Sequence, residues 1–231
     1  MFILRFLLGF VIGYFIYTIS FLCCECLRKK QALSIKTIVC EFQHIHRSKI
    51  VSDYFLIMTS IALVSYLSNF YYSQIWQSAV ICGFCACLCV IAYIDRCTML
   101  IPNHCLILLS ILGIGFLFPP LTCSWTQRFY GMFSVSGFML LVNLIQEDSF
   151  GGGDIKLIAI CGFYLGADCV ITAMLMAVCG GGLYAIWLIY IKKIGLKAHI
   201  AFAPFLCTSL MIAIFIGEQL VSAYISLLLL S

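Results

Sequence analysis

The chain has 231 residues, of which 64% are hydrophobic and only 10% are charged, and its mean hydropathy is +1.14. A soluble globular domain carries about 25% charged residues, so this composition excludes that class. Disorder is excluded as well, because 19 Phe, 12 Tyr and long aliphatic runs are not the polar composition of a disordered segment. The sequence therefore predicts an all-α, polytopic membrane helix bundle, with the lipid bilayer as its solvent and partner.

The 15 cysteines do not indicate a disulfide scaffold. Most of them lie within apolar runs, where a thiol behaves as a small hydrophobic side chain. We therefore expect free thiols.

Membrane-spanning helices need about 20 mostly apolar residues each. Runs near that length predict about eight transmembrane helices, at roughly 2–22, 54–72, 75–94, 103–119, 128–145, 155–166, 169–191 and 200–218. The sixth run would cover only about 18 Å at the helical rise, so it is either a thin, tilted span or a segment buried among its neighbours. We predict two regions: 1–53, with the first transmembrane helix and a short basic loop, and 54–231, a seven-helix membrane domain.

The distribution of Lys and Arg predicts the orientation, because these residues are enriched in cytoplasmic loops. The basic loop 23–53 is placed inside, which leaves the N-terminus outside. With eight alternating spans, only Arg5 and Arg128 then lie on the outer side. The cations on the inner side are Arg28, Lys29, Lys30, Lys36, Arg47, Lys49, Arg96, Lys156, Lys192, Lys193 and Lys197. The net charge of +4 is thus a topology signal, and no nucleic-acid partner is expected.

Two of the nine acidic residues lie at the inner ends of predicted spans. Asp95 closes the third run and Asp154 opens the sixth, so the predicted topology places both carboxylates at the same height. An ionisable group next to hydrocarbon is costly and tends to be functional. Each aspartate also has a purely structural explanation, Asp154 as a helix N-cap and Asp95 as a partner of Arg96.

Three successive glycines precede Asp154, and an N-cap does not need them. Gly151, Gly152 and Gly153 indicate instead that backbone or a ligand approaches closely, or that φ is positive. Pro102, which follows Asp95, is explained more simply as the first residue of the fourth helix.

An aspartate pair formed by the third and sixth helices would have a defined chemistry. Ionising both of two adjacent carboxyl groups costs electrostatic free energy, so the pair shares one proton. One group then acts as a base and the other as an acid. Such a pair can activate water and protonate a carbonyl oxygen, which is peptide hydrolysis without a metal or a covalent intermediate.

These residues carry a family resemblance. Gly151-Gly152-Gly153-Asp154-Ile155-Lys156-Leu157 resembles the GxGD motif, followed by hydrophobic-Lys-Leu, of the type IV prepilin peptidases. Asp95 with Ile101-Pro102-Asn103 resembles that family's first catalytic aspartate with its downstream Ile-Pro. Ala201-Phe202-Ala203-Pro204-Phe205-Leu206 is similar to the stretch that opens the family's last helix, although Ala203 stands where Gly is usual and Ala201 where Pro is usual. The resemblance covers roughly residues 54–231.

The resemblance implies an integral membrane aspartic endopeptidase of the cytoplasmic (inner) membrane, with 54–231 as its catalytic domain and Asp95 and Asp154 as its catalytic residues. Its substrates would be prepilins or pseudopilins, which serve pili, secretion or competence. The enzyme would remove their short basic leader at the cytoplasmic face. The acidic pair Glu147 and Asp148 would attract the cationic leader. The residues expected to shape the loop or contact the substrate are Gly151, Gly153, Lys156 and Pro102.

Proteolysis by two aspartates requires no cofactor. Many members of the family also N-methylate the new terminus with S-adenosylmethionine, and this cofactor is expected here only if methyltransfer is retained. Longer relatives carry two zinc-binding CxxC pairs in a loop that has only about 30 residues in this chain, and no Gly-rich nucleotide-binding turn is present. We expect no metal; the candidate ligands for a zinc site are Cys23, Cys26, Cys40 and His44.

Two alternatives share the membrane aspartates. A small proton-coupled carrier would use Asp95 and Asp154 as a proton relay, but such carriers usually place their acids near the midplane and often show two similar halves. A GxGD protease acting on preflagellins, or on transmembrane stubs as in presenilin-like proteases, would keep the chemistry and change the substrate. The spacing from Asp95 to Pro102 and the eight predicted spans favour the prepilin class.

Overall fold

The computed structural model describes residues 63–64, 67, 75–118, 123–146, 149–192 and 201–230. These residues are almost entirely helical and contain no strand, so the predicted all-α class is confirmed for this part of the chain. The chain divides into two compact units, Met1–Met99 and Leu100–Ser231. The predicted division at residue 53 remains a prediction.

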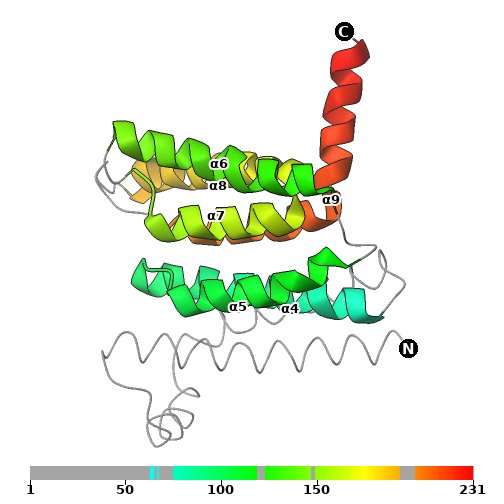
Figure 1. The fold of residues 1–231 in the computed structure, drawn as a ribbon. Coiled ribbons are helices and arrows are strands. Elements are labelled where there is room, and N and C mark those ends of the chain that lie inside the picture. The colour runs from blue at the N-terminus through cyan, green and yellow to red at the C-terminus, as the bar shows by residue number, and fades with distance from the viewer. Residues whose placement is uncertain are drawn as a thin grey trace, which may run out of the picture. The chain divides into compact units, whose positions relative to one another are not determined.

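Seven helical elements make up the described part of the chain (Figure 1). They are α4 (Ile75–Thr98), α5 (Asn103–Gly113), the 3-10 turn η2 (Ile114–Leu117), α6 (Trp125–Ile145), α7 (Gly152–Leu165), α8 (Ala167–Lys192) and α9 (Ala203–Leu230). Each of the last six predicted runs corresponds to one of these helices. The first predicted run, 2–22, and nearly all of the second, 54–72, lie outside the described residues.

Three of the described helices are long and apolar enough to cross a membrane: Trp76–Thr98, Trp125–Ile145 and Ala167–Ile191. Only 28% of the apolar window of α6 and 22% of that of α8 is buried. The large apolar side chains of α6 that are more than half exposed are Trp125, Phe129, Tyr130, Phe133, Phe138, Leu140, Leu141, Leu144 and Ile145. A surface this apolar is stable in lipid rather than in water, so the chain is a membrane protein.

The short helix α7 is the central element of the second unit. It contacts α5, α6, α8 and α9, and the side chains of Leu157 and Ile158 are fully buried. Its 14 residues give a length of about 21 Å. Burial among neighbouring helices, one of the two explanations for the short sixth run, therefore agrees with the structure, and that α7 also crosses the bilayer stays a prediction.

A glycine contact joins α6 to α7. A Cβ atom added to Gly131 would collide with the backbone of Gly162, and one added to Gly162 would collide with the backbone of Gly131. Lipid tails are as apolar as the helix surfaces, so helices in a membrane associate through close packing, which small residues allow. Neither glycine was singled out from the sequence, because each is isolated in its own apolar run.

Arg128 of α6 binds the C-terminal end of α7. The side chain is only 2% exposed. Its Nη1 donates to the carbonyl oxygens of Phe163 at 3.2 Å and Tyr164 at 3.4 Å, and its Nη2 donates to that of Phe116 at 2.9 Å. The last carbonyls of a helix lack helical partners, and a cation there also interacts favourably with the helix dipole. Arg128 therefore fixes the end of α7 to η2.

A single residue connects α7 to α8. Gly166 has φ +86°, in the left-handed region that favours glycine, and its N–H donates to the carbonyl of Gly162 at 3.0 Å. This conformation allows α8 to begin at Ala167, directly after α7 ends.

We predict that Arg128→Leu lowers the free energy of unfolding by about 3 kcal/mol, because three carbonyls lose a charged donor away from water. Thermal unfolding followed by circular dichroism in detergent measures this loss. Arg128→Lys should retain part of the stability, since it keeps the charge without the fork of donors. The control is Gln127→Leu at an exposed position of the same helix, and an equal effect of the two Leu variants would contradict the role of Arg128.

Candidate active site

Asp95 lies in the last turn of α4 and is only 7% exposed. The helix ends at Thr98 because Met99 adopts a left-handed conformation, with φ 54°, while its N–H still donates to the carbonyl of Asp95 at 2.7 Å. The carboxyl group of Asp95 is thus carried by the negative end of a helix.

Asp154 lies in the first turn of α7 and is 9% exposed. The N-cap position is occupied by Gly151, and the N–H of Asp154 donates to the carbonyl of Gly151 at 3.0 Å. Asp154 is therefore not the helix N-cap, and this purely structural explanation of the residue is wrong. Its carboxyl group nevertheless lies at the positive end of the helix, where the first N–H groups have no helical partners.

Close approach, and not positive φ, explains Gly153, one of the three glycines before Asp154. Gly151 has φ −63°, an ordinary value, and Gly166 is the only described glycine with positive φ. A Cβ atom on Gly153 would lie 2.9 Å from Cβ of Ile101, which is too close. A Cβ atom on Gly151 would lie 3.1 Å from Oδ2 of Asp154. At Gly152, none of the described residues would come within 4 Å of such an atom.

The connection between α6 and α7 is held by Asn143. Its Nδ2 donates to the carbonyl of Phe150 and its Oδ1 accepts from the N–H of Phe150, both at 2.8 Å. The Phe150 ring also meets the edge of Phe202, with centroids 6.2 Å apart. Because Phe150 precedes Gly151, these contacts fix the chain directly before α7 and connect it to the start of α9.

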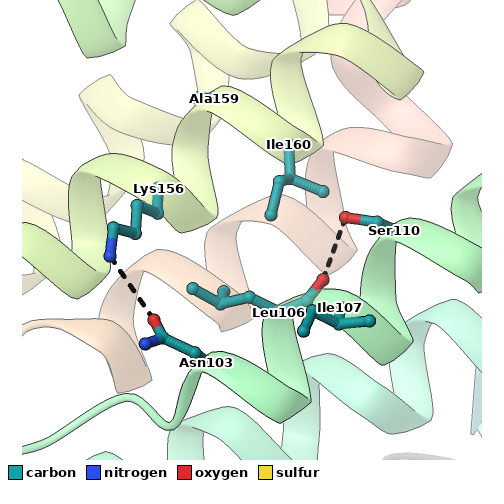
Figure 2. Close-up of a pocket in the computed structure, with 7 residues that line it drawn as sticks. All are labelled: Asn103, Leu106, Ile107, Ser110, Lys156, Ala159 and Ile160. Atoms are coloured by element: carbon teal, nitrogen blue, oxygen red, sulfur yellow. Dashed lines mark hydrogen bonds between the residues drawn. The ribbon is translucent and has the colours of Figure 1, made fainter.

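Lys156 and Pro102 lie at the same end of the unit, between α7 and α5. The Nζ of Lys156 donates to Oδ1 of Asn103 at 3.4 Å (Figure 2). Pro102 is the N-cap of α5, with φ −68°, and its carbonyl accepts from the N–H of Cys105 at 3.1 Å. The expectation that Pro102 is the first helical residue is therefore off by one position, because α5 begins at Asn103.

The structure brings together three segments of the second unit that the sequence analysis had singled out separately. They are 101–103, 150–156 and 201–206, which meet through Ile101 with Gly153, Lys156 with Asn103, and Phe150 with Phe202. Asp95 belongs to the first unit and Asp154 to the second, so the approach of their carboxylates remains a prediction.

Several predicted site residues lie outside the described residues: Glu147, Asp148, Cys23, Cys26, Cys40 and His44. In the described part of the chain the cysteines form no disulfide, and most of them are buried, as expected for small hydrophobic side chains.

Asn143 and Arg128 were not predicted as structural residues. Both are polar side chains within or beside an apolar run, and a polar group at membrane depth needs a partner. That signal was present in the sequence. It does not identify the partners, which come from segments distant along the chain.

Comparison with known proteins agrees with the resemblance. Residues 82–186 match the model of the type IV leader peptidase family. The chain is also similar to the prepilin leader peptidase/N-methyltransferase of Bacillus subtilis (strain 168), with 32% identity over 147 residues. The aligned region covers 63% of this chain and 59% of that protein. No solved structure matches the chain. Neither match supports the proton-coupled carrier.

We predict that Asn143→Leu frees the segment before α7. Loss of two hydrogen bonds, at about 1 kcal/mol each, should raise the amide exchange rate of Phe150 about thirtyfold. Hydrogen exchange followed by mass spectrometry measures this rate. Asn103→Leu is the matched control, because it removes an amide from the same end of the unit without touching Phe150. Unchanged exchange in Asn143→Leu would show that the two bonds do not hold the segment.

Proposed function

We propose, from the match of residues 82–186 to the model of the type IV leader peptidase family, that the chain is a membrane aspartic endopeptidase of this family. It cleaves the basic leader from type IV prepilins or pseudopilins at the cytoplasmic face. The similarity to a prepilin leader peptidase/N-methyltransferase supports this substrate class.

The observation that carries the proposal is the setting of Asp154. Its carboxyl group is buried at the start of α7, and the backbone around it is held by Ile101 against Gly153 and by Asn143 on Phe150. A reacting group has to be held in place by its surroundings. The same end of α7 is the end at which the family resemblance places the chemistry.

We assign the second catalytic carboxyl group to Asp95, and distinct roles to the two aspartates. Asp154, at the start of α7, is the proposed base, and Asp95, in the last turn of α4, is the proposed acid. The pair shares one proton.

Water is the nucleophile in this mechanism. Asp154 accepts a proton from water as the water oxygen bonds to the scissile carbonyl carbon, and Asp95 gives its proton to the carbonyl oxygen. The tetrahedral intermediate then collapses. The C–N bond breaks, the leaving nitrogen takes the proton from Asp154, and Asp95 regains its proton from a hydroxyl group of the intermediate.

The glycines at the start of α7 leave room for the substrate. None of the described residues would contact a Cβ atom on Gly152, so an extended substrate strand can approach the backbone beside Asp154. Glu147 and Asp148 precede this point in the sequence. We propose that they attract the cationic leader, while the apolar stem of the substrate lies among the helices.

We propose leader cleavage as the activity of this chain, and N-methylation of the product stays a prediction. The loop 23–53, where contacts with S-adenosylmethionine would be sought, lies outside the described residues. Cleavage by an aspartate pair needs no cofactor and no metal.

The proposed topology has eight spans in the cytoplasmic (inner) membrane, with the N-terminus outside and the active site facing the cytoplasm. The support for it is the grouping of nearly all Lys and Arg residues on one side of such an arrangement. Asp95 and Asp154 then lie at the same height.

We predict that Asp95→Asn and Asp154→Asn each reduce cleavage of a prepilin by more than about a hundredfold while the protein still inserts. Asparagine keeps the shape of the side chain but can neither accept nor release the catalytic proton. Conversion of a full-length pseudopilin in membranes measures the rate. Asp168→Asn, at the start of α8, is the matched control and should cleave normally.

Substantial cleavage by either Asn variant would refute the aspartate mechanism. Cys23→Ser combined with Cys26→Ser should leave cleavage largely intact. Loss of cleavage in that double variant, with normal insertion, would instead indicate a zinc site.

The topology makes a separate prediction. Reporter tags placed after Lys30 and after Lys197 should both report the cytoplasmic side, and a tag near Ser124 the outer side. The measurement is protease or thiol accessibility in intact cells. If the tags after Lys30 and Lys197 lie on opposite sides, α7 does not cross the membrane. Asp95 and Asp154 then do not lie at the same depth, and the proposed topology is wrong.

A further inference from the structure

A furrow of about 330 Å³ lies between α5 and α7. Its walls are aliphatic, with Leu106 and Ile107 on α5 and Ala159 and Ile160 on α7 (Figure 2). Ile107 is 61% exposed, so the furrow is open on the outer surface of the unit. The hydroxyl group of Ser110 needs no hydrogen-bond acceptor from a ligand in the furrow, because it donates to the carbonyl of Leu106 at 2.9 Å.

One end of the furrow is cationic. Lys156 and Asn103 line it there, and both are exposed. The contact between them uses one of the three N–H donors of the ammonium group and the oxygen of the amide, which leaves N–H groups of both side chains for a ligand. Within the described residues Lys156 makes no ion pair. This end of the furrow therefore suits an anion.

The length of the furrow suits a hydrocarbon chain. From Asn103 to Ser110 the α5 helix rises about 10 Å, so an extended acyl chain can lie along the aliphatic walls beside the cationic end.

The furrow also lies away from the proposed catalytic carboxylate. Asp154 and Lys156 are two residues apart, which is about 200° around the helix. Asp154 is buried, whereas Lys156 is exposed on the opposite face of α7, together with Ala159 and Ile160 along the furrow.

We propose that this furrow binds an anionic phospholipid, with one acyl chain between α5 and α7 and the phosphate on Lys156 and Asn103. Basic pockets between membrane helices bind anionic head groups in this manner. The site requires only that the chain lies in a bilayer, so it does not depend on peptidase activity.

Native mass spectrometry of the full chain released from detergent tests the proposal, with phosphatidylglycerol and phosphatidylcholine of identical acyl chains as probes. The wild type should retain phosphatidylglycerol about fivefold more than phosphatidylcholine, the factor expected for one Lys near an anionic head group. Lys156→Met should abolish this preference. Ala159→Phe fills the furrow and should reduce the retention of both lipids.

Two variants outside the furrow serve as matched controls. Arg96→Met removes another exposed cation, and Ala223→Phe adds the same ring at an exposed position of α9. Both should bind lipid as the wild type does. Because Lys156 is exposed, Lys156→Met tests the site even if Ala159→Phe fails to fold.

The proposal is wrong if Lys156→Met keeps the wild-type preference. It is also wrong if a synthetic apolar helix displaces phosphatidylglycerol from the wild type and Ala159→Phe abolishes binding of that helix. The furrow would then be a peptide site.

Discussion

The backbone contact between Gly131 and Gly162 is the constraint on which the second unit depends. It leaves no space for a Cβ atom on either helix, so α6 and α7 cross at one fixed point. The hydrophobic effect does not hold two apolar helices together in lipid. Close packing at such a contact holds them together instead. A 14-residue helix is too short to be fixed by the bilayer itself, and α7 is instead positioned by its neighbours.

The two ends of α7 are held by different means. Arg128 binds the free carbonyls at the C-terminal end, where a positive charge is favoured. At the N-terminal end, Gly153 lies against Ile101 and Asn143 holds Phe150. A carboxyl group is favoured there for the same electrostatic reason that a cation is favoured at the other end. The proposed base, Asp154, is thus carried by a helix that is fixed along its whole length.

The sequence was informative where physical signals are local. Apolar runs located all six described helices of the membrane region, and the glycines before Asp154 indicated a close approach, which Ile101 makes at Gly153. The sequence could not show that Asn143 binds Phe150, or that Gly131 meets Gly162, because those partners are selected by tertiary packing. The helix start after Pro102 was misplaced by one residue, since Pro is compatible with both the N-cap and the first helical position.

An aspartate pair that shares one proton is the central claim, and the distance between its two carboxyl groups tests that claim most directly. The measurement is an experimental structure of the chain in lipid nanodiscs with an uncleaved prepilin bound. We predict that the carboxyl carbons (Cγ) of Asp95 and Asp154 lie within about 8 Å of each other, because one water molecule can then hydrogen-bond an oxygen of each group. A separation of more than about 15 Å in that complex would contradict the claim, because no single water could then contact both groups.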